Sequence, residues 1–183
     1  RHGQTDWNRD NLLQGRSDVS LNENGISGAI AAARIISNHP VDAVFCSPLF
    51  RARQTAELVC PKMPATLDAR LSEWNFGVLE GTSVADNDTY RHMWFPKAKR
   101  VPEAETFEEV VERVSDFYRE ISLQYSDSTV LVIAHGGISA ALRVVLCGLP
   151  EHGSLYQYCL PNTTPMLFRA GETDPVILKE GSL

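Results

Sequence analysis

The architecture of this 183-residue chain follows from one segment, Thr129-Val130-Leu131-Val132-Ile133-Ala134-His135-Gly136-Gly137. Its first six residues are an unbroken apolar run rich in β-branched side chains, which predicts a strand buried on both faces, central and parallel. The glycines end this strand, and the residues after them predict a helix to about Cys147. Ligands of such sheets bind beyond the carboxyl ends of the strands, so His135 stands where a functional loop is expected.

Helices and strands alternate around this segment. The sequence predicts a helix over 22–37 capped by Asn22, a strand over 43–46, a helix from Ser47-Pro48 to about 59, a helix over 106–125, and weaker strands at 166–168 and 176–178. This alternation predicts an α/β fold, a three-layer α/β/α sandwich with a mostly parallel central sheet. Because no repeat or linker interrupts it, residues 1–183 are expected to form a single domain.

Composition and charge exclude several classes of protein. Hydrophobic residues make up 43% of the chain and charged residues 22%, as in ordinary globular domains. The net charge of −6 argues against broad capture of nucleic acid or of an acidic membrane surface. Residues 101–127 hold eight acidic and two basic side chains and therefore carry the whole net charge. We interpret them as a solvated helix face, which leaves room for a local cationic pocket elsewhere.

The four cysteines, Cys46, Cys60, Cys147 and Cys159, form no C-x-x-C pair. Two lie in apolar runs, so free thiols and a reducing, cytoplasmic compartment are expected. No signal peptide and no apolar run near the ~20 residues of a spanning helix is visible. The sequence opens on Arg1 rather than on a methionine, so we expect residues upstream of it.

Two segments with histidine are candidates for chemistry. In His135-Gly136-Gly137 the glycines permit close ligand approach, and the helix start that follows offers backbone N–H groups to an anion. The alternative is a structural imidazole. In the segment Arg1-His2-Gly3 an arginine fork stands beside an imidazole, which suits a nucleophile working next to a phosphate, and Asn8 adds a neutral donor. The alternative is a disordered chain end.

Two further segments add an arginine and a carboxylate. Arg51 and Thr55 share one helical face, and Arg51 lies in the first turn, where the helix dipole favours an anion. The alternative for Arg51 is a surface position. Glu73 stands in the apolar, aromatic loop 71–81, a setting that favours a proton donor near neutral pH. Glu80 in the same loop is interpreted as structural.

Together these segments resemble the histidine phosphatase superfamily, also called the phosphoglycerate mutase-like family. The resemblance rests on four groups of residues, in the family's order and spanning positions 1–137: Arg1-His2-Gly3 with Thr5, Trp7 and Asn8; Ser47-Pro48-Leu49 with Arg51-Ala52 and Thr55; Leu71-Ser72-Glu73 with Phe76-Gly77 and Glu80-Gly81; and His135-Gly136-Gly137.

The resemblance implies a role for each site residue. His2 is the expected nucleophile, which forms a phosphohistidine. Arg1, Arg51 and His135 are expected to bind the phosphoryl oxygens, and Asn8 and Gly136 to line the phosphate pocket. Glu73 is expected to protonate the leaving oxygen and then to activate water. No metal or other cofactor is implied, and the sequence carries no H-E-x-x-H, paired-Cys or Asp-rich motif.

This chain departs from the family pattern in two places. Family members have an apolar strand just before the R-H-G motif, and we expect that first strand to be missing from this chain. The family often shows Gly-Glu-Ser before the long helix, where this chain has Ala104-Glu105-Thr106, which leaves the role of Glu105 open.

Residues 82–104, interpreted as a short lid on the substrate side, favour the phosphatase branch. This segment lacks the arginine pair with which related mutases hold a second anionic group. We therefore expect a phosphatase of small phosphomonoesters, with a sugar phosphate or an α-ribazole phosphate-like substrate. Phosphoglycerate mutase-type transfer and non-catalytic phospholigand binding are the alternatives. The expected partner is a small phosphorylated molecule, not nucleic acid or membrane, and a homodimer stays open.

Within this segment the sequence offers four ring-bearing side chains, Tyr90, His92, Trp94 and Phe95. They are interpreted either as a surface that stacks on a ring of the substrate or as a lid packed on the domain.

Overall fold

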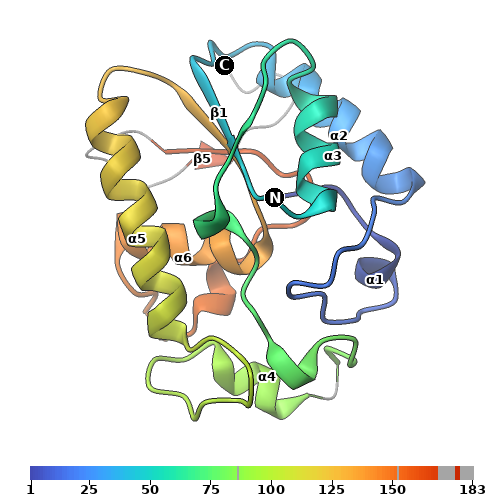
Figure 1. Cartoon of the computed structure of the whole chain (residues 1–183), viewed down its shortest axis with the longest axis vertical. Helices are drawn as coiled ribbons and strands as arrows, with labels where there is room; N and C mark the ends of the chain where they lie inside the picture. The colour runs from blue at the N-terminus through green and yellow to red at the C-terminus, as the bar shows by residue number, and fades with distance from the viewer. Residues whose placement is uncertain (86, 152, 169–175, 178–183) are drawn as a thin grey trace.

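The computed structural model describes residues 1–85, 87–151, 153–168 and 176–177. Its main sheet has the strand order β2-β1-β3, with β1 at Ala43–Cys46, β2 at Thr66–Leu67 and β3 at Val130–Ile133 (Figure 1). All pairs are parallel, and Phe45 stands opposite both Val132 and Thr66. The predicted parallel pairing is therefore confirmed.

The predicted central position of β3 is wrong for the described strands, because β1 lies in the middle and β3 at one end. Beyond the last residue of β3, the His2 N–H donates to the carbonyl of Ala134 at 2.9 Å. The first residues of the chain thus lie alongside the carboxyl end of β3. This contact brings the Arg1-His2 segment to the edge of the sheet where ligands bind.

Helices cover both faces of the sheet, as the predicted sandwich requires. Figure 1 shows α2 (Glu23–Ile36) and α3 (Phe50–Val59) on one side of β1, and α5 (Phe107–Gln124) and α6 (Gly136–Cys147) on the other. Successive side chains of a strand point to opposite faces. Accordingly Val44 and Cys46 pack against Ala52 and Ala56 of α3, whereas Phe45 joins the cluster of α5.

The remaining elements are short. They are α1 (Asp6–Arg9), α4 (Asp88–Met93), three 3-10 turns at Ala69–Leu71, Gly77–Leu79 and Leu155–Tyr158, and an antiparallel pair of β4 (Met166–Leu167) with β5 (Val176–Ile177). The weaker predicted strands therefore form a separate pair rather than part of the parallel sheet. The predicted residue Leu178 lies outside the described part of the chain.

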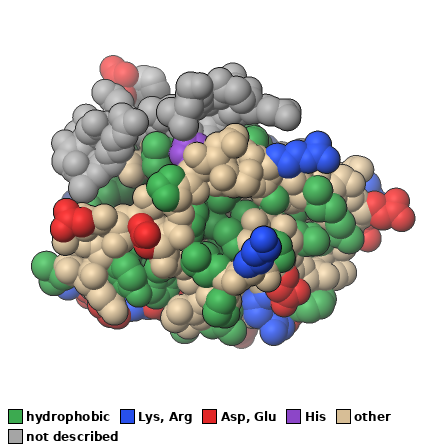
Figure 2. Space-filling view, turned by 90° about the horizontal axis from the view of Figure 1, so that it is seen from above, with side chains coloured by type: hydrophobic (Ala, Val, Ile, Leu, Met, Phe, Trp, Pro, Cys, Tyr) green, Lys and Arg blue, Asp and Glu red, His purple; other side chains and the backbone are tan. Residues whose placement is uncertain are grey.

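Charged side chains are scattered on the face seen in Figure 2, where basic and acidic groups stand among hydrophobic and neutral ones. In the described part of the chain, no helix combines the length and apolar character needed to cross a membrane. The four cysteines are free thiols, as predicted.

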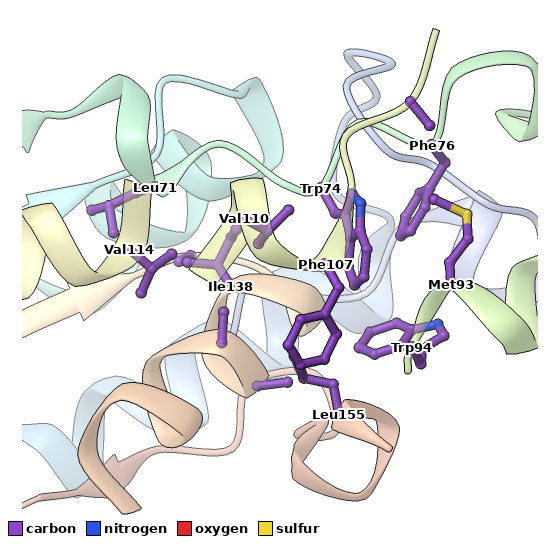
Figure 3. Close-up of a cluster of buried hydrophobic side chains, with 14 of the residues drawn as sticks. Leu71, Trp74, Phe76, Met93, Trp94, Phe107, Val110, Val114, Ile138 and Leu155 are labelled. Atoms are coloured by element: carbon purple, nitrogen blue, oxygen red, sulfur yellow. The ribbon is translucent and has the colours of Figure 1, made fainter. Parts of the chain in front are cut away.

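The core is centred on the helix predicted over 106–125. Thr106 caps it in a reciprocal capping box with Glu109. The helical spacing of its apolar residues predicts one buried stripe, which is buried at Phe107, Val110, Val114, Phe117 and Ile121 and half-buried at Val111. Figure 3 shows part of this cluster, in which α5 meets loop 71–76, α6 and the residues around α4. The core thereby fixes loop 71–76, which carries Glu73.

Two helix predictions are wrong in detail. Helix α3 begins at Phe50 rather than at Ser47-Pro48, because the Ser47 hydroxyl instead accepts the Leu49 N–H and bonds His135. In α2 the helical spacing of Ile26, Ala29, Ile30, Ala33 and Ile36 predicts one apolar face, but Ile26 and Ile30 remain 39% and 44% exposed.

Helix α2 instead buries Gly25, Ala29, Ala32 and Ile36. A side chain at Gly25 would begin only 2.0 Å from the carbonyl oxygen of Gln4. Because α2 approaches the N-terminal segment closely, the helix buries its face of small residues, and Ile26 and Ile30 remain exposed to solvent.

Candidate active site

The imidazole of His2 is buried, with 2% of its surface exposed. Its Nδ1 lies 2.7 Å from the carbonyl oxygen of Gly3, which can only accept a hydrogen bond, so Nδ1 carries the proton. Its Nε2 lies 3.3 Å from the Nε–H of Arg51 and therefore accepts. Burial, followed by the positive charges of Arg51 and Arg1, holds the pKa of His2 well below its ordinary value. His2 is thus neutral, with a lone pair on Nε2.

Arg51 is fully buried at the start of α3. Its two terminal nitrogens donate to the carbonyls of Ser17 and Gly15, each at 2.8 Å. Burial lowers the pKa of Arg51 to about 10, which keeps the guanidinium charged at neutral pH. The hydroxyl of Thr55 donates to the Arg51 carbonyl and accepts the Gly3 N–H, which joins α3 to the N-terminal segment. Arg51 thus lies beside His2, with its charge fixed by the two carbonyls.

His135 lies against His2, with ring centroids 5.1 Å apart. Its Nε2 bonds the Ser47 hydroxyl at 2.7 Å, whereas its buried Nδ1 has no partner among the described residues. Burial, then the nearby Arg51 charge, holds the pKa of His135 well below its ordinary value. The Ser47 hydroxyl therefore fixes the ring through Nε2, and Nδ1 has no hydrogen-bond partner among the described residues.

Arg1 and Gly136 meet at the start of α6. A terminal nitrogen of Arg1 donates to the Leu160 carbonyl at 2.7 Å, and its buried Nε has no partner in the described ranges. A side chain at Gly136 would begin 3.2 Å from the sulfur of Cys159 and 3.4 Å from the guanidinium carbon of Arg1. Gly136 thus lets the arginine approach the backbone at the helix start.

Glu73 occupies the other side of the same helix start. Its carboxylate accepts the N–H of Trp74 at 2.9 Å and the N–H of Gly137 at 3.1 and 3.3 Å. Its side chain is 8% exposed, but backbone donors rather than apolar side chains contact its oxygens. The apolar setting expected for this carboxylate is therefore only partial, and the carboxylate is held in a fixed orientation.

Asn8 has a structural role that the sequence did not suggest. Its amide oxygen accepts the backbone N–H and the hydroxyl of Thr5, each at 3.2 Å, and an N–H of Asn162 at 3.3 Å. The side chain thereby closes the capping box of α1 and still lines the cavity.

Two networks behind the site hold its loops. Glu80 accepts the backbone N–H groups of Arg16, Ser17 and Phe76, which confirms its structural interpretation. It thereby fixes the loop whose carbonyls bind Arg51. Glu105 accepts both sides of the Arg113 guanidinium at 2.8 and 2.9 Å.

Arg113 in turn donates to the carbonyl of Ser72 at 2.8 Å and to that of Glu73 at 3.3 Å. Glu105 therefore supports the Glu73 loop through Arg113.

These groups surround a cavity of about 390 Å³. Six predicted residues line it: Arg1, His2, Asn8, Arg51, Glu73 and Gly136. His135 is outside the lining and contacts the site through the ring of His2. Several lining residues were not predicted from the sequence, among them Gln14, Tyr156, Leu160, Pro161 and Asn162.

Of these missed residues, Gln14 alone left a signal, a polar residue beside a glycine in the apolar stretch 12–15. Its buried amide oxygen has no partner within the described ranges.

The four ring-bearing residues of segment 82–104 divide into two pairs. Tyr90 and Trp94 are buried and line the cavity, so they are both packed on the domain and turned to the site. His92 and Phe95 are exposed and outside the lining.

The arrangement suits transfer of a phosphoryl group. A neutral imidazole with a lone pair on Nε2 faces a cavity that also holds two guanidinium groups, a helix N-terminus and an oriented carboxylate. No group of three His, Cys, Asp or Glu side chains with metal-binding geometry is found among the residues that the structure describes.

Comparisons with known proteins agree with this geometry. A family model described as the histidine phosphatase superfamily (branch 1) matches residues 1–180. The probable phosphoglycerate mutase GpmB of Yersinia pestis (strain Pestoides F) is 31% identical over 160 residues, which cover 83% of this chain and 74% of that protein.

Two solved structures share the fold. The mycobacterial glucosyl-3-phosphoglycerate phosphatase with VO3 aligns with a TM-score of 0.77 and 27% identity, covering 90% of this chain and 87% of that one. A phosphoserine phosphatase mutant from Entamoeba histolytica, in complex with phosphoserine, aligns with a TM-score of 0.78 and 24% identity, covering 97% and 91%. The family match, the sequence relative and the site geometry lead to one conclusion: this chain belongs to the histidine phosphatase superfamily.

Proposed function

We propose that this protein is a metal-independent phosphatase that hydrolyses a small phosphomonoester through a phosphohistidine at His2. One observation carries the proposal. The neutral ring of His2 accepts a hydrogen bond from Arg51 at Nε2, so its lone pair stands beside a fixed positive charge in the cavity. A nucleophile and an anion-binding group are thereby combined at one point.

The reaction has two steps. The phosphoryl oxygens bind Arg1, Arg51 and the start of α6 beside Gly136, while His135 packs against the ring of His2 and holds it in place. Nε2 of His2 attacks phosphorus, the bond to the leaving oxygen breaks, and Glu73, which is protonated when this step begins, gives that oxygen its proton. Water then attacks the phosphohistidine, Glu73 takes a proton from it, the N–P bond breaks, and phosphate leaves with both side chains restored.

Mutase activity is the second candidate, because the Yersinia relative carries that name. A phosphoglycerate mutase must hold a second anionic group on its substrate. Among the described residues, the arginines that line the cavity are Arg1 and Arg51, and no lysine joins them. The bases of segment 82–104 lie elsewhere, with Arg91 paired to Asp88 and Arg100 to Glu109. The lining therefore favours a phosphatase.

The other parts of the proposal concern setting and partners. The relatives are named as phosphatases or a probable mutase, which supports an enzyme rather than a non-catalytic binding protein. Four free cysteines support the proposed cytoplasmic location. The proposed partner is a small phosphorylated molecule, either a sugar phosphate or an α-ribazole phosphate-like ester. The lining described above comes from one chain, so the proposal needs no second copy.

The test is phosphate release by the full-length protein from a panel of phosphomonoesters with a chelator present. We expect turnover, a phosphoryl adduct on the peptide that carries His2, and a loss of at least about 10³-fold in kcat for His2→Ala. His92→Ala is the matched control, because His92 is exposed on α4, and it should keep full activity.

Two outcomes would count against the proposal. A folded protein that releases no phosphate from any ester, or a His2→Ala variant with appreciable turnover, contradicts it. Interconversion of phosphoglycerates in the presence of the bisphosphate, faster than hydrolysis, would instead support the mutase.

A further inference from the structure

One wall of the cavity is a continuous row of aromatic rings. Phe76, Tyr90, Trp94 and Tyr156 all line the cavity. Neighbouring ring centroids lie 5.4, 5.7 and 5.3 Å apart along this row, and each pair meets edge to face. The rings come from loop 71–76, from α4 with its cap, and from the turn 155–158. Three segments distant in sequence thus build one apolar surface, which we call the aromatic wall.

The aromatic wall is buried at its base and exposed at its mouth. Tyr90 and Trp94 are 7% and 2% exposed, whereas Tyr156 is 55% exposed. A second contact, of Trp74 with Trp94 at 5.3 Å, joins the wall to the hydrophobic core. Repacking buried rings costs free energy, so the base of the wall presents a fixed surface to a substrate in the cavity.

Charge is confined to the phosphoryl end of the cavity. Among the residues that the structure describes, the charged side chains that line the cavity are Arg1, Arg51 and Glu73, and the proposed reaction uses all three. The other lining residues are aliphatic, aromatic or neutral polar, such as Leu12, Leu13 and Asn162. A second charge on the substrate would therefore be taken out of water without a partner, which is costly.

We infer that the natural substrate is a phosphomonoester whose alcohol is uncharged and carries an aromatic or similarly flat apolar ring. This inference rests on the proposed phosphatase function and narrows its substrate. The ring packs on the aromatic wall while the phosphate meets His2, Arg1 and Arg51. Of the two substrate classes expected from the sequence, the wall favours the ring-bearing ester over the sugar phosphate. Tyr156, at the open end, sets this preference.

The test compares esters whose leaving alcohols have similar basicity, so that binding rather than intrinsic reactivity is measured. The panel is 2-phenylethyl phosphate, ethyl phosphate, glucose 6-phosphate and 3-phosphoglycerate. We expect kcat/KM for 2-phenylethyl phosphate to exceed that for ethyl phosphate by at least about tenfold, and to exceed the values for the other two by more.

Two variants separate the wall from the fold. Tyr156→Ala should lower the ratio of kcat/KM between 2-phenylethyl and ethyl phosphate by about tenfold. Phe95→Ala is the matched control, because Phe95 neighbours Trp94 in sequence, is 43% exposed and is absent from the lining. It should leave the ratio unchanged.

The outcomes distinguish the two proposals. Equal or better use of ethyl phosphate, glucose 6-phosphate or 3-phosphoglycerate would overturn the inference while phosphatase activity stands. An unchanged ratio in Tyr156→Ala would also overturn it. No turnover of any ester would overturn the proposed function and the inference together.

Discussion

His2 and Arg51 form a pair in which each residue fixes the other. The Gly3 carbonyl orients the ring, and the guanidinium reaches Nε2 only because the carbonyls of Gly15 and Ser17 hold its two other nitrogens. The contact of 3.3 Å between the two side chains is long for a hydrogen bond, so an entering phosphate oxygen can take it over at little cost. The charge needed in the transition state is in place before the substrate arrives.

Replacing Arg51 by lysine tests this arrangement. Lysine keeps the charge but lacks the planar fork that spans Gly15, Ser17 and His2. We expect Arg51→Lys to lower kcat/KM by about 10²- to 10³-fold, measured by steady-state hydrolysis with urea unfolding run in parallel. Arg53→Lys, on the exposed face of the same helix, is the control and should change neither quantity. Arg51→Lys activity within threefold of wild type would show that charge alone suffices.

At the scale of elements, the start of α6 contacts two side chains of the site, Arg1 and Glu73. Gly136 lets Arg1 approach the backbone, and Gly137 donates its N–H to Glu73. A side chain at position 137 would begin 2.6 Å from an oxygen of Glu73, which must then move. The double glycine therefore does more than end a strand, because it sets the distance between the helix and the carboxylate.

A double-mutant cycle on Gly137 and Glu73 tests this spacing. Gly137→Ala should lower kcat by about 10- to 100-fold by displacing the carboxylate. The same change in a Glu73→Ala background should have little further effect, because the group that it displaces is already gone. Single-turnover rates of the four proteins measure the coupling. Independent, multiplicative losses would show that the glycine acts elsewhere.

Helices with strong internal patterns could be predicted from the sequence. The buried face or first residue of a helix could not be predicted where it depends on a contact with a distant segment. Helix α5 carries its own capping box and apolar stripe, so local information suffices. The buried face of α2 depends instead on Gln4 approaching Gly25, a contact between residues 21 positions apart. The start of α3 depends on His135, which draws the Ser47 hydroxyl away from a capping role.

Across the whole molecule, the residues at the reacting end of the cavity could be predicted from the sequence, whereas those at its substrate end could not. The reacting residues stand in short motifs that resemble a family, so their meeting could be expected. Gln14 and Tyr156 stand in no such motif, and they reach the cavity only through the packing of distant loops. Two residues of the aromatic wall, Tyr90 and Trp94, could be suspected from the sequence, but Tyr156 joins the wall through tertiary contacts alone.

The distribution of charge also makes sense at this scale. The net charge of −6 belongs to residues 101–127, much of which is the outer face of α5, whereas Arg1 and Arg51 face the cavity. A protein that is acidic overall can therefore hold a cationic point in its cavity while its acidic segment repels polyanions.

Two buried neutral histidines should make stability depend on pH. The folded chain holds the pKa values of His2 and His135 well below the ordinary 6.5, to which unfolding returns them. Above pH 6.5 both states are unprotonated and no difference arises. Below it the unfolded chain binds protons that the folded chain does not. The free energy of unfolding should therefore fall with decreasing pH, approaching about 1.4 kcal/mol per pH unit for each ring.

Urea unfolding at pH 7.5, 6.5 and 5.5 measures this slope, because most carboxylates stay ionised throughout that range. His135→Gln should remove about half of the slope, since one of the two buried rings is lost. His92→Gln is the matched control, because it removes a histidine that is exposed on α4 and leaves both buried rings in place. A wild-type free energy that is flat from pH 7.5 to 5.5 would mean that the rings accept protons in the folded state. In that case the neutral nucleophile on which the mechanism depends would not exist.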